Sequence, residues 1–330
     1  MEYRFLGKTG IKVSKLCFGT MTFGNEADEA TSVAIYRRCR DVGINFFDSA
    51  NIYAGGQSEV ILGRLIAGHR DEVIITSKAF FPTGPDVNAR GASRRHLRLA
   101  VEASLKRLNT DYIDIYYIHH FDDVTALEET LRGLEDLVRQ GKIIFPAVSN
   151  FAAWQIEKAL GIAERRGWTP LACIQPMYNL VKRQAEVEIL PMAQAEGLGV
   201  VPYSPLGGGL LSGKYGTDRQ PEKGRLVENP MYRTRYGEAW MYDVAERFTQ
   251  FAQAHGYEPA ALAVAWVASH PAVTAPIIGA RNLDQLEGVL KALDIHMTPD
   301  LREQIASLSP TPPPATDRSE ERTAYSMVSR

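Results

Sequence analysis

The sequence contains little cysteine and almost no excess charge of either sign. Its three cysteines, Cys17, Cys39 and Cys173, lie far apart in apolar stretches and form no Cys-x-x-Cys pair. We therefore expect small buried side chains in a reducing cytosol, and a cytoplasmic protein. The 37 basic and 39 acidic residues leave a formal net charge of −2, which does not favour a nucleic-acid partner.

The sequence also lacks the marks of a membrane or secreted protein. No run of about 18 apolar residues is present, so no transmembrane helix is predicted. Residues 1–10 lack the apolar region of a secretory signal. The composition, 45% hydrophobic and 23% charged, is that of an ordinary globular protein.

Eight short apolar runs, rich in β-branched or aromatic residues, are separated by segments with helical spacing. In the segment 127–140, leucine recurs every three or four residues, and the pattern ends at Gly141, a typical helix C-terminus. Alternating strands and helices predict a parallel sheet, and eight such units favour a closed (β/α)8 barrel over an open sheet. The predicted strands are residues 15–19, 44–48, 73–78, 113–119, 143–150, 171–175, 198–204 and 275–280.

Three segments lie outside the eight units. Residues 2–13 predict a β-hairpin that turns at 8–10 and closes the bottom of the barrel. The segment 207–238, rich in Gly, Arg and Tyr, predicts a long loop after the seventh strand. We expect one barrel domain over residues 1–308 and an extended or mobile proline-rich tail over 309–330.

Reactive side chains follow three consecutive predicted strands. Asp48 ends the second strand, with Tyr53 just beyond it, Lys78 ends the third strand and His119 ends the fourth. Because the carboxyl ends of the strands meet at one mouth of a barrel, these four side chains should lie together. A buried Lys–Asp pair alone is equally consistent with a structural role. Four reactive types at one mouth favour catalysis.

The combination of Tyr53 and Lys78 predicts proton donation to a carbonyl oxygen. A free phenol has a pKa of about 10, and a neighbouring cation held by Asp48 should lower it. Tyr53 would then act as a general acid, while His119 orients the carbonyl or shares in proton delivery. No side chain is an obvious nucleophile for the carbonyl carbon, so a bound hydride donor is expected.

Residues near the later strand ends predict a nucleotide site. Tyr203 would stack on a ring, and the glycine-rich segment 204–214 offers backbone N–H groups to phosphates. Arg281 lies near the start of a predicted helix, a favourable place for an anion. The hydroxyl and amide groups suited to a carboxamide belong to Ser149, Asn150 and Gln175.

Two other kinds of site are alternatives from the motifs alone. Residues 208–215 nearly match a P-loop, but Tyr215 stands where the hydroxyl that binds Mg²⁺ belongs. Residues 119–123, His-His-Phe-Asp-Asp, suggest part of a metal site, but no histidine at another predicted strand end completes three ligands. No G-x-G-x-x-G follows the first strand, which argues against a Rossmann domain.

Taken together, these motifs make the sequence similar to the aldo-keto reductase superfamily, NADPH-dependent carbonyl reductases built on a (β/α)8 barrel. The similar segments occur in family order, cover roughly residues 2–305 and include GINFFDSANIYAGGQSE, VIITSK and YSPLGGGLLSGKY. The resemblance implies that the catalytic residues are Asp48, Tyr53, Lys78 and His119. It implies that NADPH is bound by Thr20, Asp48, Ser149, Asn150, Gln175, Tyr203, Ser204, Leu206, Lys214, Gly279, Arg281 and Gln285.

The sequence departs from the family pattern at three positions. His120 stands where members of the long form usually have Arg, Ala147 where Gly is usual, and Val289 where Asn is common. None of these positions belongs to the four catalytic candidates. Arg281 still favours NADPH over NADH, because a guanidinium suits a phosphate dianion.

The resemblance implies a small-molecule aldehyde or ketone as substrate and leaves the oligomeric state undetermined. Aromatic residues near the strand ends predict a flat or apolar substrate, whereas the arginines of 207–238 would suit an acidic one. As an alternative function, some proteins similar to this family are NADPH-binding regulatory subunits of membrane channels that turn over slowly. The pocket is predicted to be shaped by the segment 207–238 together with Met21, Tyr53, Phe80, Phe81 and Phe121.

Overall fold

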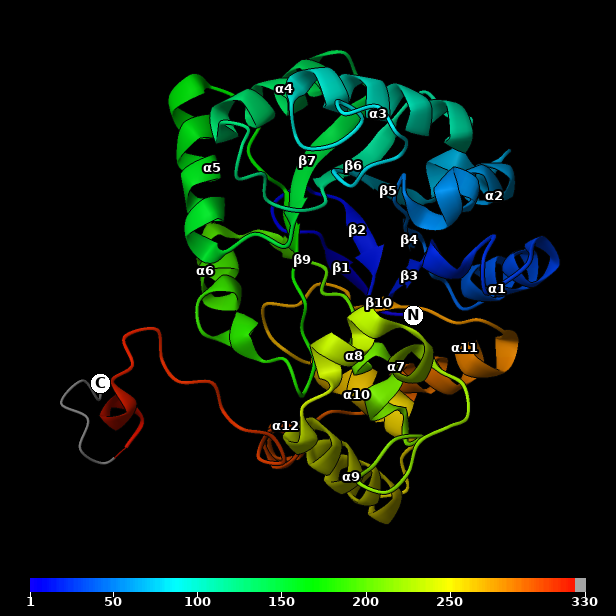
Figure 1. Cartoon of the computed structure of the whole chain (residues 1–330), viewed down its shortest axis with the longest axis vertical. Helices are drawn as coiled ribbons and strands as arrows, with labels where there is room; N and C mark the ends of the chain where they lie inside the picture. The colour runs from blue at the N-terminus through cyan, green and yellow to red at the C-terminus, as the bar shows by residue number, and fades with distance from the viewer. Residues whose placement is uncertain (324–330) are drawn as a thin grey trace.

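Eight parallel strands form one sheet in the computed structural model, which describes residues 1–323. The strands follow the chain order along the sheet, and the last strand pairs with the first (Figure 1). Each strand overlaps one of the runs predicted from the sequence. The strands are β3 Cys17–Gly19, β4 Phe46–Asp48, β5 Ile74–Ala79, β6 Ile113–Ile118, β7 Ile143–Ser149, β8 Cys173–Gln175, β9 Gly199–Val200 and β10 Ile277–Ile278.

The barrel closes between β9 and β10. The backbone N–H groups of Thr274 and Ala275 donate to the Val200 carbonyl at 2.9 and 3.3 Å. The N–H of Ile277 donates to the Pro202 carbonyl at 2.8 Å. Because β10 also pairs with β3, the ring of strands is continuous. The predicted (β/α)8 barrel is confirmed.

One helix follows each of the first six strands of the barrel and packs on its outside (Figure 1). Within residues 1–323, four more helices lie between β9 and β10, and two follow β10. Gly141 has φ +68° just after α4, in agreement with the helix end predicted there. The helices are α1 Glu29–Asp41, α2 Gln57–Ile66, α3 Arg94–Leu108, α4 Leu127–Arg139, α5 Ala153–Arg166, α6 Ile189–Glu196, α7 Arg225–Glu228, α8 Pro230–Tyr236, α9 Ala239–Ala254, α10 Pro259–Ala268, α11 Leu283–Leu290 and α12 Pro299–Ala306.

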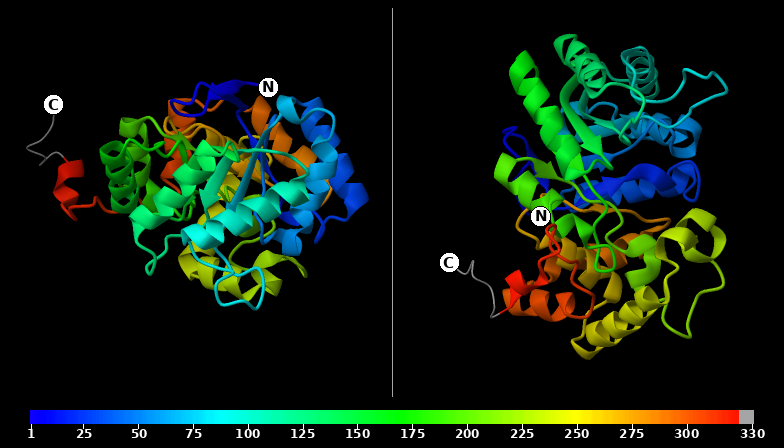
Figure 2. Two further views of the ribbon diagram at one scale, coloured as in Figure 1. Left: turned by 90° about the horizontal axis from the view of Figure 1, so that it is seen from above. Right: turned by 60° about the vertical axis from the view of Figure 1, so that its left-hand side comes forward.

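The predicted N-terminal hairpin is present and closes the bottom of the barrel. Strands β1 (Tyr3–Phe5) and β2 (Lys12–Ser14) pair antiparallel, with Arg4 opposite Val13. Leu6 and Val13 are fully buried against residues of the barrel interior. Figure 2 (left) shows the hairpin at the end of the molecule opposite the yellow segment that carries α8. The other end, where the strands terminate, is therefore the mouth.

Alternation along the strands decides which side chains face the barrel interior. In β4, Phe46 is inside, Phe47 packs under the outer helices, and Asp48 is inside again. The same period of two places Thr76 and Lys78 of β5 inside. The apolar interior layer, which includes two of the three buried, unpaired cysteines, consists of Cys17, Phe46, Ile115, Tyr117, Ala147, Cys173, Val201 and Ala275.

The segment 207–238 follows β9, the seventh strand of the barrel, as the long loop that we predicted there, but it is not irregular throughout. It contains a 3₁₀ helix, η5, and the short helices α7 and α8. Asn229 caps α8 through its side chain and is followed by proline, and both are signals for the start of a helix. The 3₁₀ helices are η1 Thr20–Thr22, η2 Tyr53–Gly56, η3 Arg70–Glu72, η4 Gln184–Glu186, η5 Gly207–Ser212, η6 Lys291–Asp294 and η7 Ser319–Arg322.

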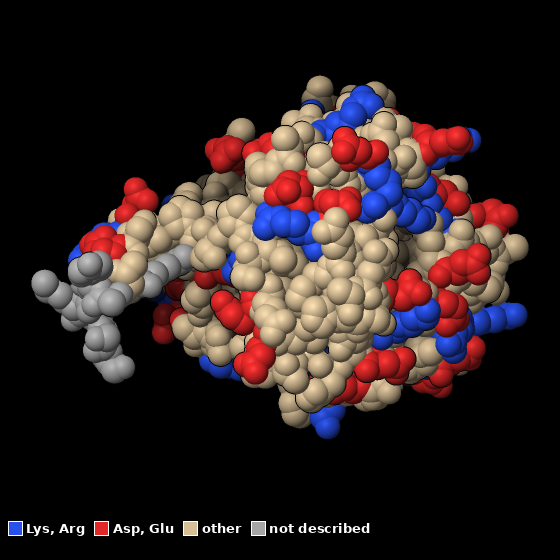
Figure 3. Space-filling model, turned by 90° about the horizontal axis from the view of Figure 1, so that it is seen from below, with Lys and Arg blue, Asp and Glu red and all other residues tan. Residues whose placement is uncertain are grey.

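The C-terminal tail leaves the barrel beyond α12 (Figure 1). In its described part, 309–323, η7 is the only regular element, and the remainder of the predicted tail, 324–330, lies outside the described residues. No helix in the described chain is long and apolar enough to cross a membrane. Figure 3 shows basic and acidic side chains interspersed on one face, around an area without charge.

Candidate active site

A buried ion pair lies at the carboxyl ends of β4 and β5. Lys78 Nζ lies 2.6 Å from Asp48 Oδ2 and also donates to the Ser49 carbonyl at 2.7 Å. The other carboxylate oxygen of Asp48 accepts from Thr76 Oγ1 at 2.6 Å and from Gln175 Nε2 at 2.9 Å. These hydrogen bonds and the ion pair offset the free-energy cost of removing the two charges from water.

Tyr53 lies beside this pair, with its ring centre 5.1 Å from Lys78 Nζ. Burial raises the pKa of the Tyr53 phenol above its ordinary value of 10, and the positive charge of Lys78 opposes this shift without cancelling it. Our expectation of a lowered pKa is therefore wrong for the free protein, because desolvation outweighs the cation. Burial also opposes the charge on Lys78, but Asp48 and Tyr53 together raise the pKa of Lys78 above 10.5.

The chain turns sharply after Tyr53. Ala54 has φ +49°, and two glycines with positive φ follow it. Left-handed backbone costs a non-glycine residue about 1–2 kcal/mol. Asn150 and Ser204, which follow β7 and β9, have φ values of +59° and +57°. Such strain tends to gather at functional sites, and here three strained residues follow strands of one barrel.

His119 follows β6 and contacts Tyr53 edge-on, with ring centres 6.1 Å apart. Its Nδ1 atom is buried and has no hydrogen-bond partner within residues 1–323. Burial, followed by the charge of Lys78, lowers the pKa of His119 well below 6.5, so the imidazole is neutral at neutral pH. A buried polar atom without a partner next to Tyr53 indicates a place for a ligand.

The side chains predicted to bind a carboxamide form one hydrogen-bonded group. Ser149 lies opposite Gln175 in the β7–β8 ladder, and its hydroxyl donates to the Gln175 carbonyl at 2.9 Å. Asn150 Nδ2 donates to His119 O at 2.9 Å and to Ser149 Oγ at 3.1 Å. Tyr203 Oη donates to Asn150 Oδ1 at 2.6 Å. Gln175 Oε1 accepts no hydrogen bond from the described residues, so it can accept one from an amide.

The glycine-rich segment 204–214 bends through left-handed backbone. Three consecutive glycines, 207–209, have φ values of +57°, +69° and +104°, which only glycine adopts readily. Leu206 precedes them as the N-cap of η5, and Lys214 is exposed. No helix follows directly, since the next helix begins at Arg225. A P-loop lysine opens a helix, so this segment lacks the context of that motif.

Three residues that were predicted to bind NADPH follow β10, and two of them are hydrogen-bonded to each other. Arg281 Nη2 lies 3.0 Å from Glu26 Oε1, and Glu26 also pairs with Arg225 at 3.3 Å. The Arg281 N–H donates to Gln285 Oε1 at 3.1 Å, while Gly279 is exposed. A phosphate bound to Arg281 would therefore meet the Glu26 carboxylate.

Some side chains of the site escaped the sequence prediction. Thr76 shares the interior face with Lys78 because it lies two residues before it, so strand period was a usable signal. Glu26 had no local signal. Thr20, which was predicted, places its hydroxyl 3.2 Å from Asp48 O and 2.7 Å from Ser58 Oγ, so its side chain braces the strand end.

Aromatic rings form a wall beside His119. Phe81 lies 4.9 Å from His119 and 5.5 Å from Phe80 between ring centres, and His120 lies 5.4 Å from Phe80. Phe121, which was predicted as part of the same pocket, packs instead on another ring cluster at 5.1 Å from Phe151. The wall next to His119 is therefore aromatic, with the Phe80 and Phe81 rings perpendicular to each other.

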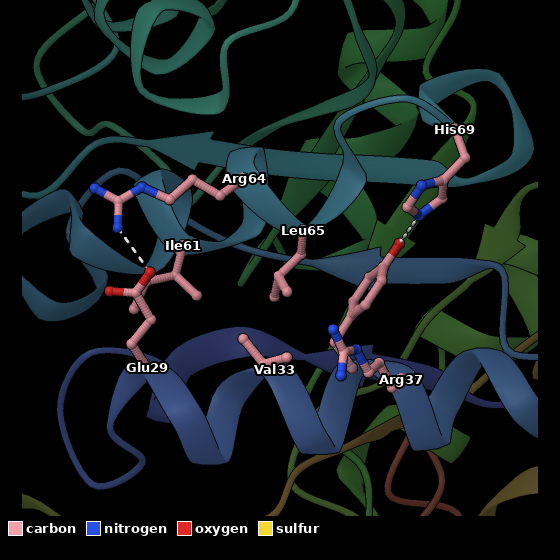
Figure 4. A pocket seen from close by; sticks show the side chains of 8 residues that line it. Glu29, Val33, Arg37, Ile61, Arg64, Leu65 and His69 are labelled. Atoms are coloured by element: carbon pink, nitrogen blue, oxygen red, sulfur yellow. Dashed lines mark hydrogen bonds and ion pairs between the residues drawn. The ribbon is translucent and has the colours of Figure 1, made fainter.

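The outer helices α1 and α2 enclose a separate hollow of about 380 Å³ (Figure 4). Glu29 and Arg64 pair across it at 2.7 Å, and Tyr36 Oη lies 2.7 Å from His69 Nε2. The hollow contains none of the predicted site residues. Within residues 1–323, no three His, Cys, Asp or Glu side chains gather to hold a metal ion.

Known proteins resemble this chain over nearly its whole length. The sequence profile of the Aldo/keto reductase family matches residues 15–310. An uncharacterized oxidoreductase of Bacillus subtilis is 39% identical over 329 residues, which cover 94% of this chain and 97% of that protein. A probable voltage-gated potassium channel subunit beta of Arabidopsis thaliana is 37% identical over 95% of this chain and 99% of its own. A norsolorinic acid reductase of Aspergillus flavus is 33% identical over 91% of this chain and 79% of its own.

Proposed function

Because the chain belongs to the aldo/keto reductase family, we propose that it reduces an aldehyde or ketone to an alcohol with NADPH. The observation that carries this proposal is the position of Tyr53 between Lys78 and His119 at the mouth of the barrel. Asp48 holds the lysine in place. An acid, a cation and a neutral imidazole around one point suit an oxygen that gains negative charge.

The nucleotide would lie along the carboxyl ends of β7 to β10. Bound NADPH would supply a hydride to the carbonyl carbon. The free Oε1 atom of Gln175 and the hydroxyl of Ser149 would bind the carboxamide, and Tyr203 would stack on the ring. Arg281 would bind a phosphate, as its place just before α11 favours.

Tyr53 would donate the proton. Its raised pKa keeps the phenol protonated at neutral pH, which a general acid for reduction requires. Lys78 stays charged beside Asp48 and would stabilise the phenolate that remains after proton transfer. The neutral His119 would form a hydrogen bond with the carbonyl oxygen and orient it.

The substrate would be a small carbonyl compound with a flat or apolar part. Phe80 and Phe81 meet at right angles, and Phe81 also contacts His119, so an aromatic surface lies next to the imidazole that contacts Tyr53. Planar molecules gain contact area and favourable ring packing on such a surface. A relative named norsolorinic acid reductase supports the reductase function.

The test is NADPH oxidation with a panel of aldehydes, comparing the wild type with Tyr53→Phe. We expect turnover in the wild type and a loss of about 10²- to 10⁴-fold in kcat in the variant, with NADPH affinity unchanged. Tyr3→Phe is the matched control, because this exposed tyrosine lies on the hairpin at the opposite end. Near-full activity of Tyr53→Phe would contradict the mechanism.

A second candidate is a regulatory or redox-sensing subunit that binds NADPH and turns over little. The observation in its favour is that relatives of Arabidopsis thaliana and rice are named probable potassium channel subunits beta, at 37% and 35% identity. The same panel separates the two functions. Tight NADPH binding with negligible turnover on every aldehyde supports the subunit, and rapid turnover supports the reductase.

A further inference from the structure

Helix α8 is fixed across the glycine-rich segment beside Tyr203. The Tyr232 ring lies so close to Gly208 that a Cβ atom there would be 2.7 Å from Tyr232 Cδ1. The Tyr236 hydroxyl accepts from Asn179 Nδ2 at 3.2 Å, and the same amide donates to the Ser204 carbonyl at 2.9 Å. Both tyrosines are buried. One face of α8 is therefore held against the strand ends.

Arg235 belongs to this face of α8. Residues 232, 235 and 236 are spaced by three and four, so their side chains are neighbours on the helix surface. The guanidinium of Arg235 lies 5.4 Å from the centre of the Tyr232 ring. Burial raises the pKa of Tyr203, and the positive charge of Arg235 opposes this rise. Arg235 therefore lies within electrostatic range of Tyr203, at the nucleotide end of the site.

Two arginines lie near the Tyr232 ring, and Arg235 is the one without an anionic partner among residues 1–323. Arg225 lies 5.7 Å from the centre of the Tyr232 ring and pairs with Glu26 at 3.3 Å. No carboxylate of residues 1–323 lies within 4.0 Å of the Arg235 guanidinium. Its hydrogen bond to Met231 Sδ, at 3.9 Å, is weak. A half-buried guanidinium is a strong donor to carboxylates, and this one is available.

We propose that Arg235 binds an anionic group of the substrate, so that the preferred carbonyl compound carries a carboxylate in addition to its flat apolar part. The aromatic wall of Phe80 and Phe81 would receive the apolar part, and α8 would receive the anion. The inference rests on the proposed reductase function, since it names the substrate class of the same site.

The experiment measures binding without turnover. The full-length protein is saturated with NADP⁺ and titrated with benzoate and with benzamide, its neutral analogue, and tryptophan fluorescence is recorded. We expect the wild type to bind benzoate about tenfold more tightly than benzamide. Arg235→Gln should lose this preference, and Arg235→Lys should keep part of it. The control is Arg233→Gln, which removes the same charge from an exposed position of α8 and should keep the preference.

Two results would overturn the proposal. The wild type could show no preference for benzoate, or Arg235→Gln could keep the preference. If Arg235→Gln keeps the preference and also weakens NADP⁺ binding, Arg235 belongs to the nucleotide site. Failure of the proposed function would be a separate result. A wild-type protein that prefers benzoate but reduces no aldehyde would have the anion site without the reductase activity.

Discussion

Lys78 Nζ and Asp48 Oδ2 lie 2.6 Å apart, and the two side chains are 0% and 3% exposed. Both charges therefore lie inside a barrel whose next layer consists of residues such as Phe46 and Tyr117. In such surroundings each ion depends on the other, since neither has bulk water to solvate it. The pair that would support Tyr53 is thus also a condition for the stability of the fold.

We predict that replacing one residue of this pair destabilises the protein more than expected from the effect of replacing both. Lys78→Met and Asp48→Asn should each lower the free energy of unfolding by about 3–5 kcal/mol, because each leaves an uncompensated buried group. The double variant Lys78→Met/Asp48→Asn should lose less than the sum of the two single losses. Urea unfolding monitored by circular dichroism measures all three.

The matched control for these variants is an exposed ion pair. Lys291 and Glu258 lie 2.9 Å apart with side chains 57% and 56% exposed. Glu258→Gln should change the free energy of unfolding by less than about 1 kcal/mol. Strictly additive losses in the Lys78/Asp48 double variant would show that the two buried charges do not depend on each other.

The rate of carbonyl reduction should be nearly constant from pH 6 to about pH 9. The proposed mechanism requires protonated Tyr53 for reduction, and burial raises the pKa of Tyr53 above 10, so the proton is lost only at higher pH. No acid limb should appear near 6.5, because the pKa of His119 is lowered well below that value. Alcohol oxidation requires the phenolate and should rise with pH. Profiles of kcat/KM against pH in both directions test this, and an alkaline limb below pH 8 in reduction would contradict it.

The Glu26–Arg281 pair should tune the choice between NADPH and NADH. Glu26 lies 3.0 Å from Arg281 and would repel a phosphate bound there. Glu26→Gln should therefore tighten NADPH binding several-fold and leave NADH binding unchanged. Arg281→Leu should weaken NADPH binding about tenfold, also without affecting NADH, because only NADPH carries the extra phosphate. Fluorescence titrations give the six dissociation constants of the wild type and both variants for the two nucleotides, and equal changes for both nucleotides would place the phosphate elsewhere.

Asp122 should position the aromatic wall of the pocket. Its carboxylate accepts hydrogen bonds from Ala92 N at 2.7 Å and Thr125 Oγ1 at 2.8 Å, and so joins the segment after Phe81 to the segment after His119. Although burial opposes it, these bonds lower the pKa of Asp122 below 3.8, so the charge is present at neutral pH. Asp122→Ala should raise the KM for aromatic aldehydes.

The expected size of the rise in KM follows from the hydrogen bonds that Asp122→Ala removes. Each hydrogen bond to a charged group contributes about 1.5–3 kcal/mol, so we expect an increase in KM of roughly tenfold, with NADPH affinity unchanged. Asp123→Ala is the control, because the neighbouring aspartate is exposed. A parallel loss of NADPH affinity in Asp122→Ala would indicate a general disruption of the mouth instead of a positioning role.

Much of the fold could be predicted from local patterns. Each strand of the barrel lies in an apolar run, and the period of two along β4 alone explains why Asp48 shares the interior with Phe46. Gly141 likewise predicted the end of α4, and the local sequence of residues 2–13 predicted the hairpin. The short helices α7 and α8 were missed because the glycines and arginines of their segment outweighed the cap at Asn229.

The sequence by itself determined which reactive side chains end the strands, because that depends on residues next to one another in the chain. Only the tertiary structure decided how these side chains are solvated and paired. Burial raises the pKa of Tyr53 although Lys78 opposes it, and no local pattern reports burial. Glu26 pairs with Arg225 across 199 positions of the chain. Contacts between segments so far apart depend on how the barrel closes and are not encoded in any short stretch of sequence.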